Sequence, residues 1–239
     1  MTRAWIWNTS WVLPRVSARS ALSLKWLALL LMVMDHVHFV FFHREFEALY
    51  WLSRLVFPIY ALLIAQHLEQ HGANPKRYML RLCLYGVIAQ PAYMLCFGQP
   101  QLNVLFTLAL SVGAWWALKS LKARGWELAW RYALVGFVAV CLINLEFWFA
   151  GVLAVPIFAA LMRRGSWADW LLVPLLAWAI VGFRAPWMMP LMAIALWIFA
   201  ARAAPNSGQL GKPSVWAKHA FYAAYPTHLT LIAVAALVI

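Results

Sequence analysis

Long apolar runs, separated by short polar connections, fill most of this 239-residue chain. A helix needs about 20 apolar residues to cross a bilayer core, and fewer where the protein thins it. We therefore expect an all-α, polytopic transmembrane helix bundle. The pattern predicts about nine spans, near residues 22–42, 49–67, 78–97, 102–119, 129–144, 147–162, 168–182, 186–202 and 220–239.

The four spans between residues 129 and 202 are short, and we expect them to form two tight hairpins that turn at 144–146 and 182–186. Gly and Pro in the second turn favour that reading. Residues 1–21 are too polar to span, but they contain Trp residues beside Arg and suit a cytoplasmic or interfacial segment. The prediction is that segment followed by one transmembrane domain, 22–239.

Composition agrees with this pattern, because 66% of the residues are hydrophobic and 11% are charged, whereas a soluble domain is roughly a quarter charged. The net charge of +12 does not indicate nucleic-acid binding, because the basic residues occupy short connections between apolar runs. Three isolated Cys residues indicate neither a disulfide framework nor a zinc site.

The basic residues alternate between the two sides of the predicted threading. Basic residues flanking cytoplasmic ends fix orientation, so we predict a cytoplasmic N-terminus and a periplasmic C-terminus. Sixteen of the nineteen Lys and Arg fall on one side: Arg3, Arg15, Arg19, Lys25, Lys76, Arg77, Arg81, Lys119, Lys122, Arg124, Arg131, Arg163, Arg164, Arg202, Lys212 and Lys218.

Polar side chains inside apolar spans are costly and often functional, so they are the candidates for chemistry. Asp35 and His36 lie in the first span, Arg54 in the second, and His228 in the last. Helical rise places Asp35 and Arg54 about 4 Å apart in depth, so a buried ion pair is expected. The same count puts His36 and His228 near mid-membrane. Asn103, which begins the fourth span, and Gln90 are further candidates.

Each candidate also has a purely structural interpretation. Asp35 and Arg54 could only fix helix register, and His36, Asn103 and Gln90 could only hold helices together. His36, His38 and His43 are spread around their helix, so we expect no metal site. Lys25 falls on the same stripe as His36, roughly 16 Å away along the axis.

Several motifs along the chain resemble those of the TraX family, from about residue 22 to the C-terminus. They begin at Leu24-Lys25-Trp26 and end at Tyr225-Pro226-Thr227-His228. Between these come Asp35-His36, Ser53-Arg54-Leu55-Val56-Phe57-Pro58, Tyr78-Met79-Leu80-Arg81, Gln90-Pro91 and Asn103-Val104-Leu105-Phe106-Thr107.

The resemblance implies a multi-pass acetyltransferase of the bacterial inner membrane. It would move an acetyl group from acetyl-CoA to a pilin N-terminus or another envelope acceptor. A basic residue and a His with ten residues between them on the first helix also resemble other membrane acyltransferases, and Lys25 and His36 have that spacing.

The expected mechanism uses His36 as a base or acyl carrier. Asp35 and Arg54 would support it, and Asn103 or His228 would stabilise the tetrahedral intermediate. Lys25 and Arg81 lie at the basic rim and are expected to meet the CoA phosphates. Two other classes remain open: a small proton-coupled transporter that uses the His and Asp residues as a relay, and a non-enzymatic envelope assembly protein.

Overall fold

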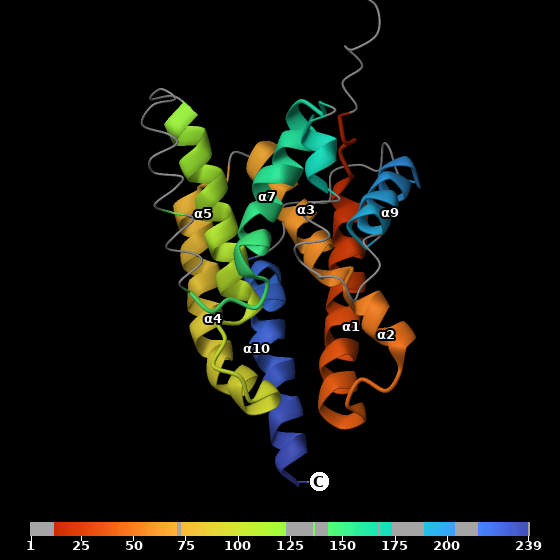
Figure 1. Ribbon diagram of the computed structural model, residues 1–239, viewed down its shortest axis with the longest axis vertical. Coiled ribbons are helices and arrows are strands. Elements are labelled where there is room, and N and C mark those ends of the chain that lie inside the picture. Colours follow the sequence, from red (N-terminus) through yellow and green to blue (C-terminus); the bar gives the residue numbers. More distant parts are fainter. Residues whose placement is uncertain are drawn as a thin grey trace, which may run out of the picture.

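The computed structural model describes residues 12–70, 73–122, 136, 143–166, 168–173, 189–203 and 215–238. Within these ranges every regular element is an α-helix (Figure 1). Most of the predicted span at 129–144, the second half of the span at 168–182, the turn at 182–186 and the Trp residues of the first 11 positions lie outside these ranges. The count of nine spans therefore stays a prediction.

In the part of the chain that the structure describes, five helical runs are long and apolar enough to cross a membrane. They are α1 (Ala18–Phe42), the pair α2 (Glu47–Ser53) and α3 (Val56–Gln70), α4 (Pro75–Phe97), α5 (Val104–Lys122) and α10 (Val215–Val238). Two described apolar helices are shorter than that, α7 (Trp148–Arg163) and α9 (Met189–Ala203). Both fall where the sequence predicts short spans.

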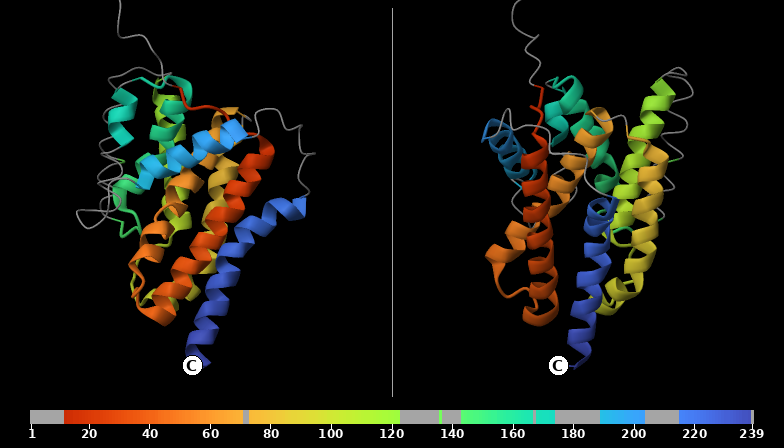
Figure 2. Two further views of the ribbon diagram at one scale, coloured as in Figure 1. Left: turned by 90° about the vertical axis from the view of Figure 1, so that its right-hand side faces the viewer. Right: turned by 180° about the vertical axis from the view of Figure 1, so that it is seen from behind.

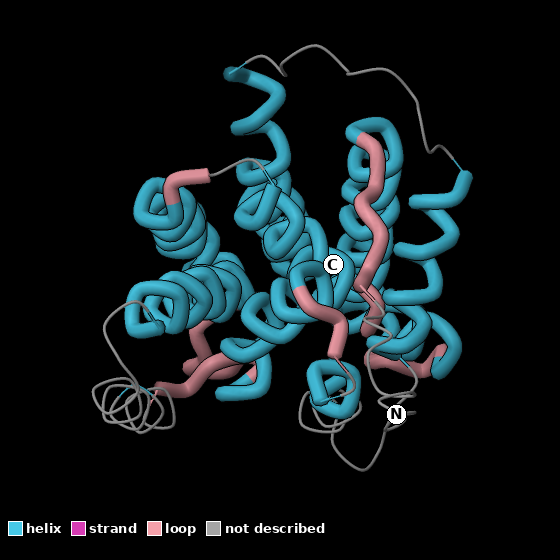
Figure 3. The backbone as a smooth tube through the Cα atoms, turned by 90° about the horizontal axis from the view of Figure 1, so that it is seen from above, coloured by secondary structure: helices cyan, strands magenta, loops and turns pink. Residues whose placement is uncertain are grey.

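Six helices form a closed ring around a common interior. Going round it, α10 packs on α4, α4 on α5, α5 on α7, α7 on α3, α3 on α1, and α1 on α10 again. Helix α9 lies obliquely across the outside of α1 and α3 (Figures 2 and 3). Helix α10 contains Pro226 and bends along its length, as expected where a proline removes a backbone hydrogen bond (Figure 2).

Local sequence signals set several helix ends. Ser17 caps α1 by accepting a hydrogen bond from the Ser20 N–H, and Asn74 caps α4 in the same way through Arg77. Gly98 ends α4 at φ 63°, a left-handed conformation that costs glycine little. These ends lie close to those predicted, although α1 begins four residues earlier than position 22.

The outer surface of the bundle is apolar, and small residues are buried at several contacts between its helices. On α4, Leu80 is 70% exposed and Leu95 is 67% exposed, as suits side chains that face lipid. Ala28, Ala61 and Ala154 are fully buried where helices meet. Small residues allow the close helix approach that drives packing inside a bilayer.

Residues 12–17 belong to the bundle rather than to its surface. Leu13 and Val16 are buried, and the Val16 N–H donates to the Gln66 side chain at 2.9 Å. The Trp197 indole N–H donates to the Pro14 carbonyl at 2.8 Å. These residues find hydrogen-bond partners on α3 and α9, while the division into a segment 1–21 and a domain 22–239 stays a prediction.

The described basic connections gather at one end of the bundle. Helices α1 and α4 begin at this end, while α5 and α7 finish there, and the C-terminus lies at the opposite end (Figure 1). The sequence predicted this shared side from the alternation of Lys and Arg. Its cytoplasmic assignment rests on the positive-inside rule.

Candidate functional site

The second predicted span is interrupted at Arg54 and Leu55, between α2 and α3. Here the backbone N–H groups of Arg54 and Leu55 bond three residues back, to Trp51 and Leu52, instead of four. Pro58 has no N–H to donate to the Arg54 carbonyl, so a regular helix cannot continue through this point. The break lies in the interior beside α1, because Ser53 and Arg54 both reach Asp35.

Asp35 is held by two neighbours from this break. The Arg54 guanidinium donates from one nitrogen to both carboxylate oxygens, at 2.9 and 2.8 Å, and the Ser53 hydroxyl donates to one of them at 2.7 Å. The Arg54 side chain also lies over the Tyr50 ring, 4.7 Å from its centroid. The contact predicted between Asp35 and Arg54 is therefore present, and Ser53 joins it.

His36 faces a different neighbour, His228 of α10. His36 Nδ1 and His228 Nε2 are 2.7 Å apart, and His228 Nδ1 lies 2.7 Å from the Ala224 carbonyl. A carbonyl only accepts, so His228 Nδ1 carries the proton and the neutral ring accepts at Nε2. His36 must then donate from Nδ1, which leaves its Nε2 with a free lone pair. The two imidazoles, which the sequence predicted at similar depth in the membrane, are hydrogen-bonded to each other.

A non-helical segment before α7 brings Glu146 into the interior. The Leu102 N–H donates to the Asn144 carbonyl at 2.9 Å, and the Glu146 N–H donates to the Leu102 carbonyl at 3.2 Å. These bonds tie the entry to α7 against the entry to α5. Of the predicted turn at 144–146, Asn144 is exposed, whereas Glu146 lines a pocket together with Arg54 and Asp35.

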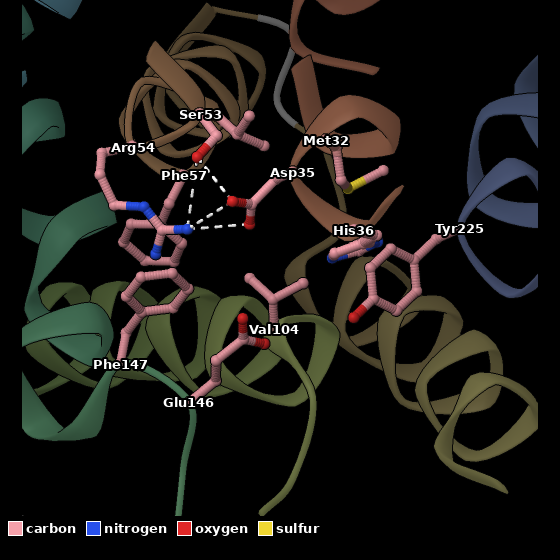
Figure 4. Close-up of a pocket in the computed structure, with 11 residues that line it drawn as sticks. Met32, Asp35, His36, Ser53, Arg54, Phe57, Val104, Glu146, Phe147 and Tyr225 are labelled. Carbon is pink, nitrogen blue, oxygen red and sulfur yellow. Dashed lines mark hydrogen bonds and ion pairs between the residues drawn. The ribbon is translucent and has the colours of Figure 1, made fainter. Parts of the chain in front are cut away.

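Helices α1, α2, α3, α5 and α10, together with the segment before α7, line a small pocket at this level (Figure 4). Its polar residues are Asp35, His36, Ser53, Arg54, Glu146 and Tyr225. Three of their atoms are buried without a hydrogen-bond partner: Arg54 Nε, Glu146 Oε2 and the Tyr225 hydroxyl. The remaining lining residues are Met32, Val56, Phe57, Val104 and Phe147. Unpaired buried polar atoms are costly, so this pocket is the candidate functional site.

Glu146 lies outside the membrane-spanning helices and carries an unusual carboxyl group. Burial raises the pKa of Glu146 to about 7, and the nearby Asp35 carboxylate acts in the same direction. The Arg54 guanidinium and the Val104 backbone amide oppose that shift without cancelling it. The carboxyl group can therefore gain or lose a proton near neutral pH.

Asn103 does not reach the pocket, although the sequence made it a candidate for stabilising an intermediate. Its side-chain N–H groups donate to the Gly86 carbonyl and to Gln90 Oε1, both at 2.8 Å, and its carbonyl oxygen accepts from the Leu105 N–H. The side-chain N–H groups therefore hold α4 to the start of α5, and the side-chain oxygen caps α5. The structural interpretation of this residue fits the geometry better.

Lys25 and Arg81 lie beside the first half of α10, toward the basic end of the bundle. The Lys25 ammonium group is 5.8 Å from the centroid of the Phe221 ring. Arg81 contacts the next residue, Tyr222, through its side chain. The two residues predicted to bind CoA therefore reach neighbouring positions of one helix, on the same side of the pocket.

Sequence reasoning missed Tyr225 and gave Glu146 no role in the site. Their positions depend on the bend of α10 and on the pairing of two loop segments, which no local pattern encodes. Ser53 could have been found from its place next to Arg54. Within the described ranges, no group of three His, Cys, Asp or Glu residues is close enough to hold a metal ion.

The fold and pocket define an α-helical membrane protein with a buried polar site at the centre of its helix ring. The family model for the TraX protein matches residues 20–236. The chain therefore belongs to the TraX family.

Two curated relatives are similar to parts of the chain. A probable fimbrial assembly protein, FimC of serogroup H1 from Dichelobacter nodosus, is 34% identical over 108 residues, which is 39% of this chain and 44% of the relative. Protein TraX of Escherichia coli is 34% identical over 109 residues, 44% of this chain and 42% of the relative. Each alignment spans less than half of the relative's length. No solved structure matches the chain.

Proposed function

We propose that this protein is an acetyltransferase of the bacterial inner membrane that modifies pilins or other envelope acceptors. The observation that carries the proposal is the hydrogen-bond chain from the Ala224 carbonyl through His228 to His36. It fixes one tautomer of His36 and leaves Nε2 as a base inside a pocket. The name of one relative, a probable fimbrial assembly protein, supports an acceptor connected with fimbriae.

In this proposal His36 Nε2 removes a proton from the acceptor amine as the amine attacks the acetyl thioester. Positioned general bases typically contribute about 100-fold to 10,000-fold to the rate. His228 acts as a positioning residue, because it holds the His36 ring and its tautomer. The Asp35–Arg54–Ser53 network keeps α1 and the α2–α3 break in register beside the base.

Acyl transfer also needs a donor to the oxyanion that forms on the thioester carbonyl. The Tyr225 hydroxyl suits this role better than Asn103, because it has no partner and lines the pocket. Lys25 and Arg81 would attract the phosphates of acetyl-CoA from the predicted cytoplasmic side. The thioester would then reach His36 from the basic end of the bundle.

The test uses purified protein in detergent, radiolabelled acetyl-CoA and the host's major pilin as acceptor. We expect His36→Gln, which keeps a donor toward His228, to lower the transfer rate at least 100-fold. A matched control is His43→Asn, because His43 is an exposed histidine at the end of the same helix. Transfer at the wild-type rate by His36→Gln would overturn the assignment.

A further inference from the structure

Glu146 is the one acidic group of the pocket that lacks a counterion there. Asp35 is neutralised by Arg54, at 2.8 Å. Glu146 Oε2 is buried and has no hydrogen-bond partner, and Figure 4 shows its carboxyl group pointing toward the Asp35–Arg54 pair. A buried carboxylate oxygen without a hydrogen-bond partner is expensive, so the pocket is suited to receive a cation.

We propose that Glu146 is the acceptor-binding group of this pocket: it binds the ammonium form of the acceptor's amino group and takes the first proton from it. This inference rests on the proposed acetyl transfer. A protein N-terminus is mostly protonated at neutral pH, with a pKa near 8. Such an ammonium group supplies the missing positive charge, but it cannot attack until it loses a proton.

The step balances with the groups in the pocket. Glu146 takes one proton from R–NH3⁺, which gives R–NH2 and a neutral carboxyl group. The amine nitrogen then forms a bond to the acetyl carbonyl carbon, and the C–S bond breaks. His36 Nε2 takes a second proton from that nitrogen and passes it to the CoA thiolate. The products are the acetylated amine, the CoA thiol and one proton, which Glu146 releases.

The charged and titratable groups around Glu146 are compatible with this role. Arg54 and Arg44 lower its pKa, while Asp35 raises it. Tyr93 of α4 and Tyr225 of α10 are also close enough to interact electrostatically with the Glu146 carboxylate. Since burial raises the pKa of Glu146 to about 7, binding of an ammonium should strengthen as pH rises through 7 and weaken above the pKa of the amine.

The experiment measures binding without acetyl-CoA. Tetra-alanine amide with a free N-terminus is titrated into the purified protein at pH 7.5, and its N-formyl derivative is titrated in parallel. We expect wild-type protein to bind the free amine at least tenfold more tightly. Glu146→Gln should abolish this preference, and Glu45→Gln, which changes an exposed glutamate of the α1–α2 connection, should keep it.

The outcomes separate this inference from the proposed function. A preference for the free amine in Glu146→Gln, or equal binding of both peptides by wild-type protein, overturns the role of Glu146 even if acetyl transfer is observed. Preference in wild-type protein alone, without any acetyl transfer, supports the cation site and overturns the proposed function. Thermal unfolding of each variant checks that Glu146→Gln is folded.

Discussion

Asp35 and His36 are adjacent in the chain yet belong to separate networks, because successive helical residues point about 100° apart. Asp35 turns toward Arg54 at the α2–α3 break, and His36 turns toward His228 on α10. Asp35 therefore cannot orient the His36 ring directly. His228 orients the His36 ring instead. The Ala224 carbonyl accepts the hydrogen bond from His228 Nδ1, a position that a carboxylate often occupies in such hydrogen-bond chains.

Breaking the Asp35–Arg54 pair should destabilise the fold. Asp35→Asn leaves a guanidinium in a pocket where its side chain is only 16% exposed. Losing one partner of a buried pair costs about 3–5 kcal/mol, and the remaining exposure places this site near the lower bound. Thermal unfolding in detergent measures the effect. Arg54→Gln added to Asp35→Asn should recover part of it, and a double variant less stable than Asp35→Asn would contradict this account.

Glu146 should make stability depend on pH. Its pKa is about 7 in the folded protein and near its ordinary value of 4.5 when unfolded. The folded state thus holds a proton between these values that the unfolded state has lost. This stabilising contribution is complete below pH 4.5 and is lost as pH rises through 7. Melting temperatures from pH 5 to 8 should fall in wild-type protein and fall less in Glu146→Gln. Parallel curves for the two proteins would refute the shift.

At the scale of elements, apolar length predicted α1, α4 and α5 to within a few residues, since crossing a bilayer fixes helix length. Alternating charge predicted which helix ends share a side. The break at Arg54 had one visible signal, Pro58. The entries to α5 and α7 had none, because Leu102 and Glu146 meet through backbone bonds between segments 44 residues apart.

The contact between α5 and α7 should be sensitive to one added methyl group. A Cβ at Gly151 would lie 2.5 Å from Thr107 Cγ2 and 2.7 Å from Phe147 Cβ, so Gly151→Ala forces α7 away from α5. Overpacking of this kind costs about 1–3 kcal/mol. We expect a lower melting temperature and, because Phe147 lines the pocket, weaker acetyl transfer.

Two variants make the Gly151 prediction specific. Gly86→Ala places its Cβ 3.1 Å from the edge of the Phe106 ring, which is a milder contact on the other side of α5. Gly86→Ala should therefore lower the melting temperature less than Gly151→Ala does. Thr107→Ser removes the nearer methyl group and should restore part of the stability of Gly151→Ala. Equal losses from the two glycine variants would indicate that α5 and α7 adjust freely.

At the scale of the whole molecule, the ring of helices gathers at one point residues that the chain spreads over nearly 200 positions. The sequence predicted the pair Asp35–Arg54 and the shared depth of His36 and His228, because both follow from counting along helices. It could not predict that Glu146 and Tyr225 complete the pocket. Their approach depends on how the ring closes, with α10 packed between α1 and α4.

Orientation decides which side of this ring can receive acetyl-CoA. With every native Cys replaced by Ser, Lys76→Cys at the basic end of α4 should react with a membrane-impermeant maleimide only after the inner membrane is opened. Arg44→Cys, in the exposed connection at the other end of α1, should react in cells whose outer membrane alone is permeable. The physical reason is that basic flanks resist translocation. The reverse pattern would place Lys25 and Arg81 outside, away from cytoplasmic CoA, and would leave the proposed route of the thioester without a donor.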